Sequence, residues 1–253
     1  MRTLVVLPTY NEIENIEEVL RRVRAAIPHA DVLVVDDGSP DGTADRAEKL
    51  GLELGRIDVL SREKKSGLGS AYRAGFRTGL TQGYDVMIEM DSDLSHDPDA
   101  LPNLVAEVER GADLAIGSRY VPGGSIPDWP WPRRAISRFG CYYARVMLRI
   151  QVHDATAGFR AYHRRALAAI PLGEVRADGY GFQIEMTYLL DRQGGRIVEV
   201  PIEFRDRELG HSKMSSRIVF EALRLVTWWG IRDRMSRRRP RPQQLEPPST
   251  RST

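Results

Sequence analysis

The sequence predicts an α/β fold in which helices flank a mixed, mostly parallel sheet. Short apolar runs rich in β-branched residues alternate with amphipathic segments up to about residue 117, which is typical of strand–helix–strand units. Hydrophobic residues make up 42% and charged residues 28% of the chain, as in ordinary globular proteins. The 253 residues are enough for one large domain with a buried core.

The first five predicted strands are residues 3–7, 31–35, 57–60, 85–90 and 113–117, and predicted helices at 14–27, 41–50, 70–80 and 99–108 follow the first four. The first helix shows the pattern best, because its apolar residues recur at helical spacing: Ile16, Val19, Leu20, Val23 and Ile27. Ligands of such sheets bind beyond the carboxyl ends of the strands. The polar residues that follow each strand are therefore the candidates for a site.

The alternation weakens after residue 120. We predict a Gly-, Pro- and Trp-rich loop at 121–132, helices at 133–150 and 180–193, and strands at 156–162 and 196–204. A polar loop at 205–216 precedes a long helix at 218–235, and the residues from 236 onward have the composition of a disordered tail. The predicted organisation is one domain, 1–235, with a basic, Pro-rich tail, 236–253.

Composition excludes several classes of protein. A single cysteine, Cys141, rules out a disulfide within the chain and disfavours a Cys-based zinc site. No signal sequence and no apolar stretch of about 18 residues is present, so any membrane contact is expected to be peripheral. The net charge of +2 and the lack of a helix-turn-helix or finger pattern give no support for a nucleic-acid partner.

Two carboxylates end the fourth predicted strand, in the sequence Asp91-Ser92-Asp93. Residues i and i+2 of an extended segment point the same way, so both carboxylates can face one hard cation such as Mg²⁺ or Mn²⁺. A cation held in this way keeps positions open for phosphate oxygens and neutralises a departing diphosphate. The alternative is a solvated loop that caps the next helix, but the place at a strand end favours the metal site.

A second polar segment follows the second predicted strand, where residues 36–43 are Asp-Asp-Gly-Ser-Pro-Asp-Gly-Thr. Aspartates at this place can accept hydrogen bonds from a nucleobase or a ribose hydroxyl. They can equally form the turn and cap the next helix, as Asp41 or Ser39 would do. The two roles are compatible, because different aspartates can serve each.

Four segments in a fixed order carry a resemblance to a known family. They are Pro8-Thr9-Tyr10-Asn11-Glu12, residues 35–43, Met90-Asp91-Ser92-Asp93-Leu94-Ser95-His96, and Gly117-Ser118-Arg119-Tyr120. From about residue 3 to about residue 233, the chain resembles family-two glycosyltransferases and, among these, dolichol- and polyprenol-phosphate mannose synthases. The resemblance implies the Rossmann-like GT-A fold and sugar transfer with inversion at the anomeric carbon.

The resemblance also implies roles for individual residues. Asp91 and Asp93 would hold the metal, with Ser92 beside the donor, and Ser95 stands where some relatives carry a third, glutamine ligand. Arg119 would face the phosphates and, with the two aspartates, is a predicted catalytic residue. The guanosine part of a nucleotide-sugar donor would contact Pro8, Tyr10, Glu12, Val35 and Asp37.

Residues 207–214, Arg-Glu-Leu-Gly-His-Ser-Lys-Met, match a family stretch. There Arg207 and Lys213 would bind the donor phosphates, and Arg207 also the acceptor phosphate. A polar loop with these charges can close over anions as a lid, although a solvated basic loop has the same composition.

The segment Trp129-Pro130-Trp131-Pro132-Arg133-Arg134 puts two arginines at a helix start, where anions bind readily. The family uses an arginine here for the acceptor phosphate, and both Arg133 and Arg134 are candidates. The alternative is an aromatic loop packed on the core.

The last predicted helix, within 216–235, combines apolar residues and a Trp228-Trp229 pair with several arginines. This combination suits a membrane interface, where each basic residue near an anionic leaflet contributes about 1 kcal/mol. The alternative is an ordinary amphipathic helix docked on the core.

We therefore expect an enzyme that transfers mannose from GDP-mannose to a polyprenyl monophosphate with Mg²⁺ or Mn²⁺, peripherally bound to the cytoplasmic face of a membrane. A separate integral membrane protein is a further candidate partner. One alternative is the same fold with UDP-glucose or another nucleotide sugar as donor. The other is a nucleotide-binding membrane scaffold without catalysis, which the Asp91 and Asp93 pair disfavours.

Overall fold

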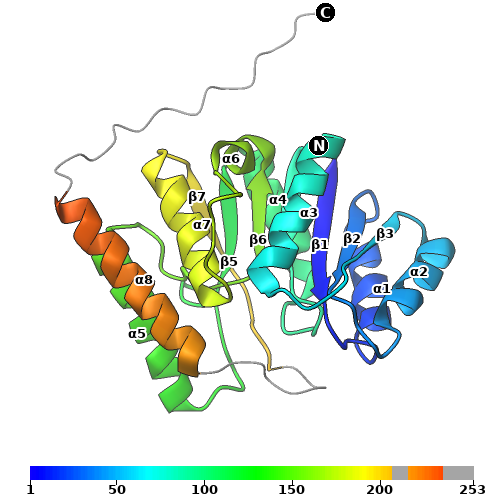
Figure 1. The fold of residues 1–253 in the computed structure, drawn as a ribbon, viewed down its shortest axis with the longest axis horizontal. Helices are drawn as coiled ribbons and strands as arrows, with labels where there is room; N and C mark the ends of the chain where they lie inside the picture. Colours follow the sequence, from blue (N-terminus) through cyan, green and yellow to red (C-terminus); the bar gives the residue numbers. More distant parts are fainter. Residues whose placement is uncertain (207–215, 236–253) are drawn as a thin grey trace, which may run out of the picture.

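The computed structural model describes residues 1–206 and 216–235. A seven-stranded sheet in the order β3-β2-β1-β4-β6-β5-β7 forms its centre (Figure 1). β6 runs antiparallel to both neighbours, and the other pairs are parallel. This confirms the mixed, mostly parallel sheet. The strands are β1 (Thr3–Thr9), β2 (Asp31–Asp36), β3 (Ile57–Ser61), β4 (Val86–Glu89), β5 (Leu114–Ser118), β6 (Arg160–His163) and β7 (Ile197–Pro201).

Helices cover both faces of the sheet, because successive side chains of each strand point to opposite sides. In β1, Val5 and Leu7 pack with α1 (Ile16–Ala26), α2 (Thr43–Leu54) and α4 (Leu101–Glu109). Leu4 and Val6 of the same strand pack on the opposite face, with α3 (Leu68–Gln82) and α7 (Tyr180–Arg192). The strands are thus buried on both sides, which explains their continuous apolar sequences.

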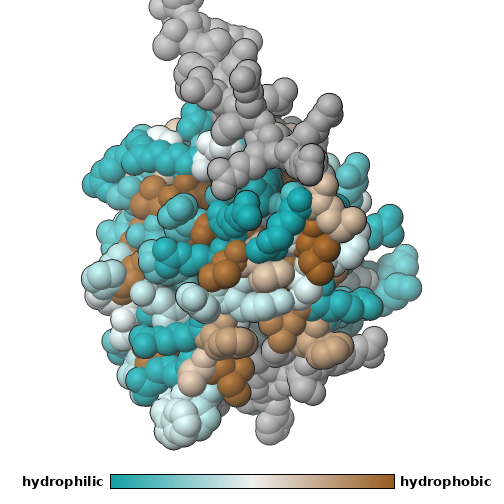
Figure 2. Space-filling model, turned by 90° about the vertical axis from the view of Figure 1, so that its left-hand side faces the viewer, coloured by the Kyte–Doolittle hydropathy of each residue, from teal (hydrophilic) through white to brown (hydrophobic). Residues whose placement is uncertain are grey.

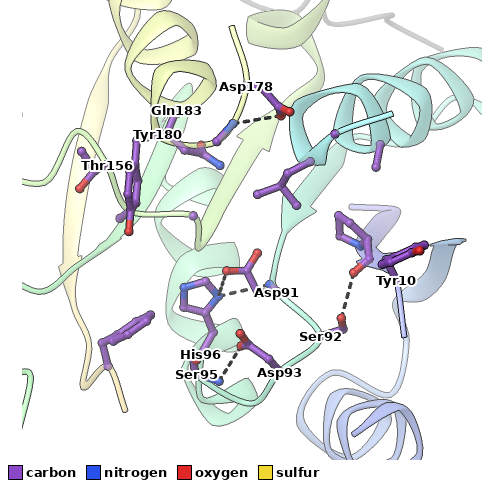
Figure 3. Close-up of a pocket in the computed structure, with 18 of the residues that line it drawn as sticks. Tyr10, Asp91, Ser92, Asp93, Ser95, His96, Thr156, Asp178, Tyr180 and Gln183 are labelled. Atoms are coloured by element: carbon purple, nitrogen blue, oxygen red, sulfur yellow. Dashed lines mark hydrogen bonds and ion pairs between the residues drawn. The ribbon is translucent and has the colours of Figure 1, made fainter. Parts of the chain in front are cut away.

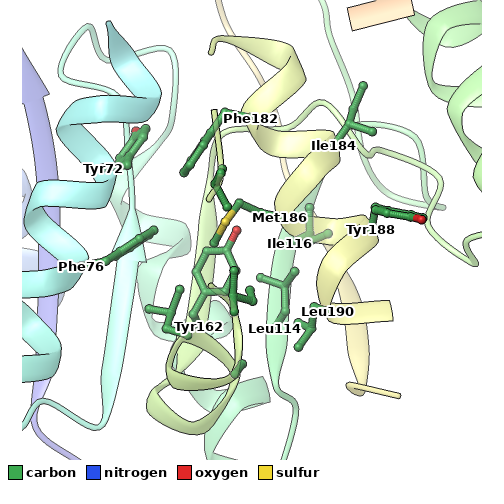
Figure 4. Packing of buried hydrophobic residues seen from close by; sticks show 14 of the residues in the cluster. Tyr72, Phe76, Leu114, Ile116, Tyr162, Phe182, Ile184, Met186, Tyr188 and Leu190 are labelled. Atoms are coloured by element: carbon green, nitrogen blue, oxygen red, sulfur yellow. The ribbon is translucent and has the colours of Figure 1, made fainter. Parts of the chain in front are cut away.

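The contact between α3 and α7 is aromatic (Figure 4). Tyr72 of α3 stacks on Phe182 of α7 with the ring centroids 6.1 Å apart, and Phe76 meets Tyr162 of β6 edge-on at 5.5 Å. α3 also lies very close to β1, because it carries glycine at the contact. A Cβ atom at Gly75 would lie 2.4 Å from Cγ1 of Val6. These contacts fix the amino end of α3 near the carboxyl ends of the strands.

Two long helices, α5 (Trp131–Leu148) and α8 (Ser216–Met235), lie side by side at one end of the molecule, next to α7 (Figure 1). They run in the same direction, since Tyr143 shares a hydrogen bond of 2.7 Å with Thr227 and Gly230 lies against Met147. The inner side of α8 is buried, and its Trp229 stacks on a tyrosine of α7. The helix is therefore amphipathic and docked, as both interpretations of its sequence require.

The structure differs from the prediction at a few elements, most of them in the second half of the chain. Strand β6 begins at Arg160 rather than near residue 156, because residues 155–159 form a loop that reaches the site described below. Helices α6 (Arg164–Ala169) and the short η1 (Pro98–Ala100) were not predicted, since neither spans two turns of periodic sequence. The disordered tail, residues 236–253, and most of the predicted polar loop lie outside the described residues, so both remain predictions.

None of the helices among the described residues has the length and hydropathy that a membrane span requires.

Candidate active site

A cavity of about 670 Å³ opens at the carboxyl ends of the strands, where the fold class predicts a ligand. We call it the main cavity. Its volume is within the range of small-molecule sites. It brings together most of the predicted site residues, and these come from five separate segments: Pro8, Tyr10, Glu12, Asp37, Asp91, Ser92, Asp93, Ser95, Arg119 and Arg133.

Asp91 sits in the middle of this cavity, with its side chain one-third exposed (Figure 3). Its Oδ1 accepts a hydrogen bond of 3.1 Å from the hydroxyl of Tyr72. Its backbone N–H donates to Nδ1 of His96 at 3.2 Å. His96 is itself buried and stacks on Phe159 at 5.1 Å. Tyr72 thus holds the carboxylate of Asp91, and His96 holds its backbone.

Asp93 lies deeper than Asp91, and its Oδ1 accepts from the backbone N–H of Ser95 at 3.1 Å. The intervening Ser92 donates from its hydroxyl to the carbonyl of Pro8 at 2.9 Å, which ties this segment to the end of β1. Leu94 has a φ of 61°, a left-handed conformation that is uncommon for leucine. The tight turn folds Ser95 back toward the carboxylates.

The two carboxylates fit a hard divalent cation, because Mg²⁺ is usually bound through one or two carboxylates together with substrate phosphates and water. Among the described residues, no group of three or more His, Cys, Asp or Glu side chains could hold a metal ion. Asp91 and Asp93 would therefore leave most coordination positions to ligand oxygens. Such a site suits a cation that arrives with a diphosphate.

The aspartates after β2 divide their roles. Asp36 shapes the loop by accepting from Thr9 at 2.8 Å and from the backbone of Ser39 at 2.8 Å. Asp37 lines the main cavity, and its carboxylate pairs with Arg62 at 3.0 Å. Val35 is not among the residues that line the cavity, because its side chain is fully buried in the hydrophobic core beneath it. Only its backbone is left to contact a donor.

Tyr10 marks the same wall, with the ammonium of Lys65 4.3 Å from its ring centre. Lys65 also lines the main cavity, and the sequence did not single it out. Glu12 is buried at the edge of the cavity, where it accepts from Asn15 at 3.0 Å. Tyr10, Lys65 and Glu12 thus provide an aromatic surface, a positive charge and a carboxylate near the end of β1.

Arg119 is buried and bound by the carboxylate of Asp154. Its Nε and Nη2 atoms donate to the two oxygens of Asp154 at 2.7 Å each, and its backbone N–H donates to the same side chain at 3.0 Å. Burial alone disfavours both charges, but the pairing outweighs it: the pKa of Asp154 is lowered and that of Arg119 is raised. The guanidinium is thus a permanently charged, fixed group at the cavity wall.

The structure separates the two arginines that begin α5. Arg133 lines the main cavity, lies 3.9 Å from the ring centre of Trp129 and pairs with Asp206 at 2.9 Å. Arg134 instead donates to the backbone carbonyl of Trp129 at 2.9 Å and lines a different, smaller cavity. Arg133 is therefore the better candidate for an acceptor phosphate. The other two candidates for binding phosphate, Arg207 and Lys213, lie outside the described residues.

Sequence reasoning missed one wall of the main cavity. Thr156 and Gly158 come from the loop before β6, Asp178 from the loop before α7, and Tyr180 and Gln183 from the start of α7 (Figure 3). Asp178 accepts from the backbone of Gly69 at 2.6 Å, which joins this wall to the amino end of α3. Asp154 and Gly158 were a usable signal, since Asp and Gly are uncommon inside a strand.

Comparisons with known proteins show which family the chain belongs to. Residues 4–170 match the family described as "Glycosyl transferase family 2". The chain is 54% identical over 231 residues to an undecaprenyl-phosphate mannosyltransferase of Micrococcus luteus, covering 91% of this chain and 95% of that one. It is 51% identical over 239 residues to a polyprenol monophosphomannose synthase of Mycolicibacterium smegmatis, covering 94% and 90%.

More distant matches share the fold. A dolichol-phosphate mannosyltransferase of Pyrococcus furiosus is 37% identical over 243 residues, 93% of this chain and 66% of that one. A solved structure of glucosyl-3-phosphoglycerate synthase from Mycobacterium tuberculosis with Mn²⁺, UDP-glucose and phosphoglyceric acid has a TM-score of 0.66 at 22% identity, covering 90% and 79%. The chain therefore has the GT-A fold and belongs to the family 2 glycosyltransferases, among the polyprenol-phosphate mannose synthases.

Proposed function

We propose that this protein transfers mannose from GDP-mannose to a polyprenyl monophosphate. The names of its relatives support the sugar and the acceptor. The observation that carries the proposal is that one cavity joins paired carboxylates, Asp91 and Asp93, to two arginines, Arg119 and Arg133. Anionic groups of both donor and acceptor can thus meet in one place.

The donor lies along the ends of β1, β2 and β4. The nucleoside of the donor packs against Tyr10 and hydrogen-bonds to Asp37 and Glu12. Because Lys65 lies beside Tyr10, its ammonium group can face the phosphates of the donor. Asp91 and Asp93 would hold Mg²⁺ or Mn²⁺ against the diphosphate. When bound, the cation offsets the negative charge that the leaving diphosphate gains.

The acceptor phosphate lies on the opposite wall, against Arg119 and Arg133. An oxygen of this phosphate forms the new bond to the anomeric carbon of mannose as the bond from that carbon to the diphosphate breaks, with inversion. A phosphate monoester is largely ionised near neutral pH, so no general base is required. The protein contributes orientation and fixed positive charge, and Asp154 keeps Arg119 charged and in place.

The end of the molecule formed by α5 and α8 faces the membrane that holds the acceptor. Among the side chains that the structure describes, 13 large hydrophobic ones are exposed, and five of these lie on α5 and four on α8. We call this surface the α5–α8 face. Arg133 of α5 and Glu221 of α8 also line the main cavity. A lipid phosphate at the surface of the bilayer can therefore reach the cavity without leaving the membrane.

The proposal is tested by turnover of the purified chain with a short polyprenyl phosphate, GDP-mannose or UDP-glucose, and Mn²⁺ or Mg²⁺. We expect lipid-linked mannose from GDP-mannose, abolished by EDTA and reduced by at least about 100-fold in Asp93→Asn. Transfer from UDP-glucose alone would move the donor while keeping the reaction. Nucleotide binding with no transfer from either donor would instead favour a scaffold.

A further inference from the structure

A second cavity of about 220 Å³ lies next to the main cavity, and Arg119 contributes to the walls of both. It is formed by the first turns of α5 and by the segment that follows β5. We call it the second cavity. Its remaining lining residues are Tyr120, Gly124, Ser125, Ile126, Pro127, Arg134 and Arg138.

The second cavity carries positive charge that the described part of the chain does not balance. Arg119 forms an ion pair with Asp154, and the nearby Arg133 forms one with Asp206. Arg134 and Arg138 form no ion pair with any carboxylate among the described residues, and no acidic side chain is among those that line this cavity.

The two arginines are one helical turn apart, so their side chains leave α5 on the same side. Arg134 is steadied by the carbonyl of Trp129 at 2.9 Å, and the guanidinium of Arg138 lies 5.4 Å from the ring centre of Tyr120. The hydroxyl of Tyr120 is in turn bound to Ser137 at 2.7 Å. Two partly ordered guanidinium groups around a small hollow suit a phosphate, which accepts paired hydrogen bonds from arginine.

This hollow borders the exposed apolar side of the same helix. Trp131, Ile136, Phe139 and Tyr142 of α5 are each more than half exposed, and Figure 2 shows hydrophobic and hydrophilic side chains interleaved over this end of the molecule. Exposed apolar side chains on soluble proteins are normally scattered singly, so four large ones on a single helix mark a candidate contact surface. Arginines along the edge of an apolar helix face are typical of helices that lie in a lipid headgroup layer.

We propose that the second cavity binds the phosphate of an anionic phospholipid headgroup, and so fixes α5 at the membrane surface beside the main cavity. The inference rests on the proposed function only in that it places the enzyme at a membrane. Its ligand is a bulk lipid, distinct from the acceptor that is consumed in the main cavity. The α5–α8 face supplies the apolar contact, and Arg134 and Arg138 supply the selectivity for negative charge.

The test measures binding of the full chain to vesicles in the absence of donor and acceptor. Vesicles of phosphatidylcholine alone are compared with vesicles that also contain phosphatidylglycerol. The variant Arg134→Gln/Arg138→Gln is compared with Arg145→Gln/Arg149→Gln, which removes the same charge outside the cavity, from the last turn of α5 and the residue that follows it. We expect the first variant to lose at least about tenfold more affinity for the anionic vesicles than the second, since it loses paired hydrogen bonds as well as charge.

Equal losses in the two variants would mean diffuse attraction only, and would overturn the proposal. Titration with inorganic phosphate distinguishes the source of the ligand. Binding of free phosphate that depends on Arg134 and Arg138, with equal vesicle affinities for the two variants, would assign the cavity to a soluble anion. Because no donor or acceptor is present, a failure of mannose transfer would leave this result unchanged, so the two proposals fail separately.

Discussion

The acidic residues around the end of β4 show how position alone gives one residue type several roles. Glu89, Asp91 and Asp93 alternate along the chain, so they start on the same side of the backbone. Glu89 is completely buried, Asp91 is one-third exposed in the main cavity, and Asp93 lies between these extremes. Only the last two can meet a cation that enters from solvent, while Glu89 is part of the core.

The burial of Glu89 predicts how the stability of the fold depends on pH. Burial raises its pKa from 4.5 to about 8, although the nearby charge of Arg160 favours ionisation. The folded state thus keeps a proton that the unfolded state releases above about 4.5. The stability from this proton is complete below that pH and is lost as the pH rises toward 8, by up to about 1.4 kcal/mol per pH unit.

The comparison is with Glu89→Gln, which stays neutral, by denaturant unfolding in EDTA between about pH 5 and pH 8. We expect the stability of the wild type to fall relative to the variant across this range. A difference between the two proteins that does not change with pH would contradict the assignment.

A second prediction concerns the carboxylate that holds Arg119. Asp154→Asn leaves a buried guanidinium without its counter-charge, which costs about 3–5 kcal/mol of unfolding free energy. Because Arg119 would also lose its orientation, we expect the KM for the acceptor to rise while that for the donor stays nearly constant. Denaturant unfolding and steady-state kinetics measure the two effects.

The matched control is Asp206→Asn, which removes the partner of Arg133. This pair is partly exposed, so the cost in stability should be at most about 1 kcal/mol. Equal destabilisation by the two substitutions would show that the ion pair of Arg119 contributes no more to the free energy of unfolding than the ion pair of Arg133.

At the scale of elements, the close contact of α3 with β1 predicts opposite effects of one substitution at two sites. Gly75→Ala places a Cβ 2.4 Å from Cγ1 of Val6, and overpacking of about 1–3 kcal/mol should exceed the helix gain of about 1 kcal/mol. Gly140→Ala in α5 meets nothing within 4 Å and should be neutral or stabilising. Denaturant unfolding of both variants measures this. Stabilisation by both would mean that α3 can move away from β1.

The elements that could be predicted are those with a complete pattern of their own. β1 and β2 are buried on both faces and read as continuous apolar runs, and α1 shows one clean apolar side. Helix α6 has only six residues, which is less than two helical turns, so its apolar residues cannot show a repeating pattern. The start of β6 was misplaced because residues 156–158 line the main cavity, while Thr156 and Phe159 of the same loop are residue types that strands favour.

In the candidate site, too, the residues that could be predicted are those that belong to a local sequence pattern. Its motifs at the ends of β1, β2 and β4 are short contiguous segments, so the sequence contains them whole. The wall around Asp178 depends on a contact with Gly69 across 109 residues, which no local pattern reveals. Val35 was assigned to the donor although the alternation along β2 places its side chain in the core.

At the scale of the whole molecule, the main cavity and the α5–α8 face lie together, and this arrangement carries the last prediction. Ile136 is 64% exposed on α5, and Leu52 is 91% exposed on α2, which lies at the opposite end of the sheet (Figure 1). A glutamate at either site replaces an exposed apolar side chain, so neither should unfold the protein. Only Ile136→Glu would place a charge against lipid.

We therefore expect Ile136→Glu to lower turnover by about tenfold or more when the acceptor is in vesicles, because a charged side chain costs about 2.5–3.5 kcal/mol at the centre of a bilayer and part of this cost in its outer apolar layer. Turnover with a short acceptor in detergent should be unaffected, and Leu52→Glu should match the wild type in both assays. A loss in detergent as well would place Ile136 in the transfer step itself. Equal activity of the two variants on vesicles would mean that another surface meets the membrane, because the position of the charge would then make no difference.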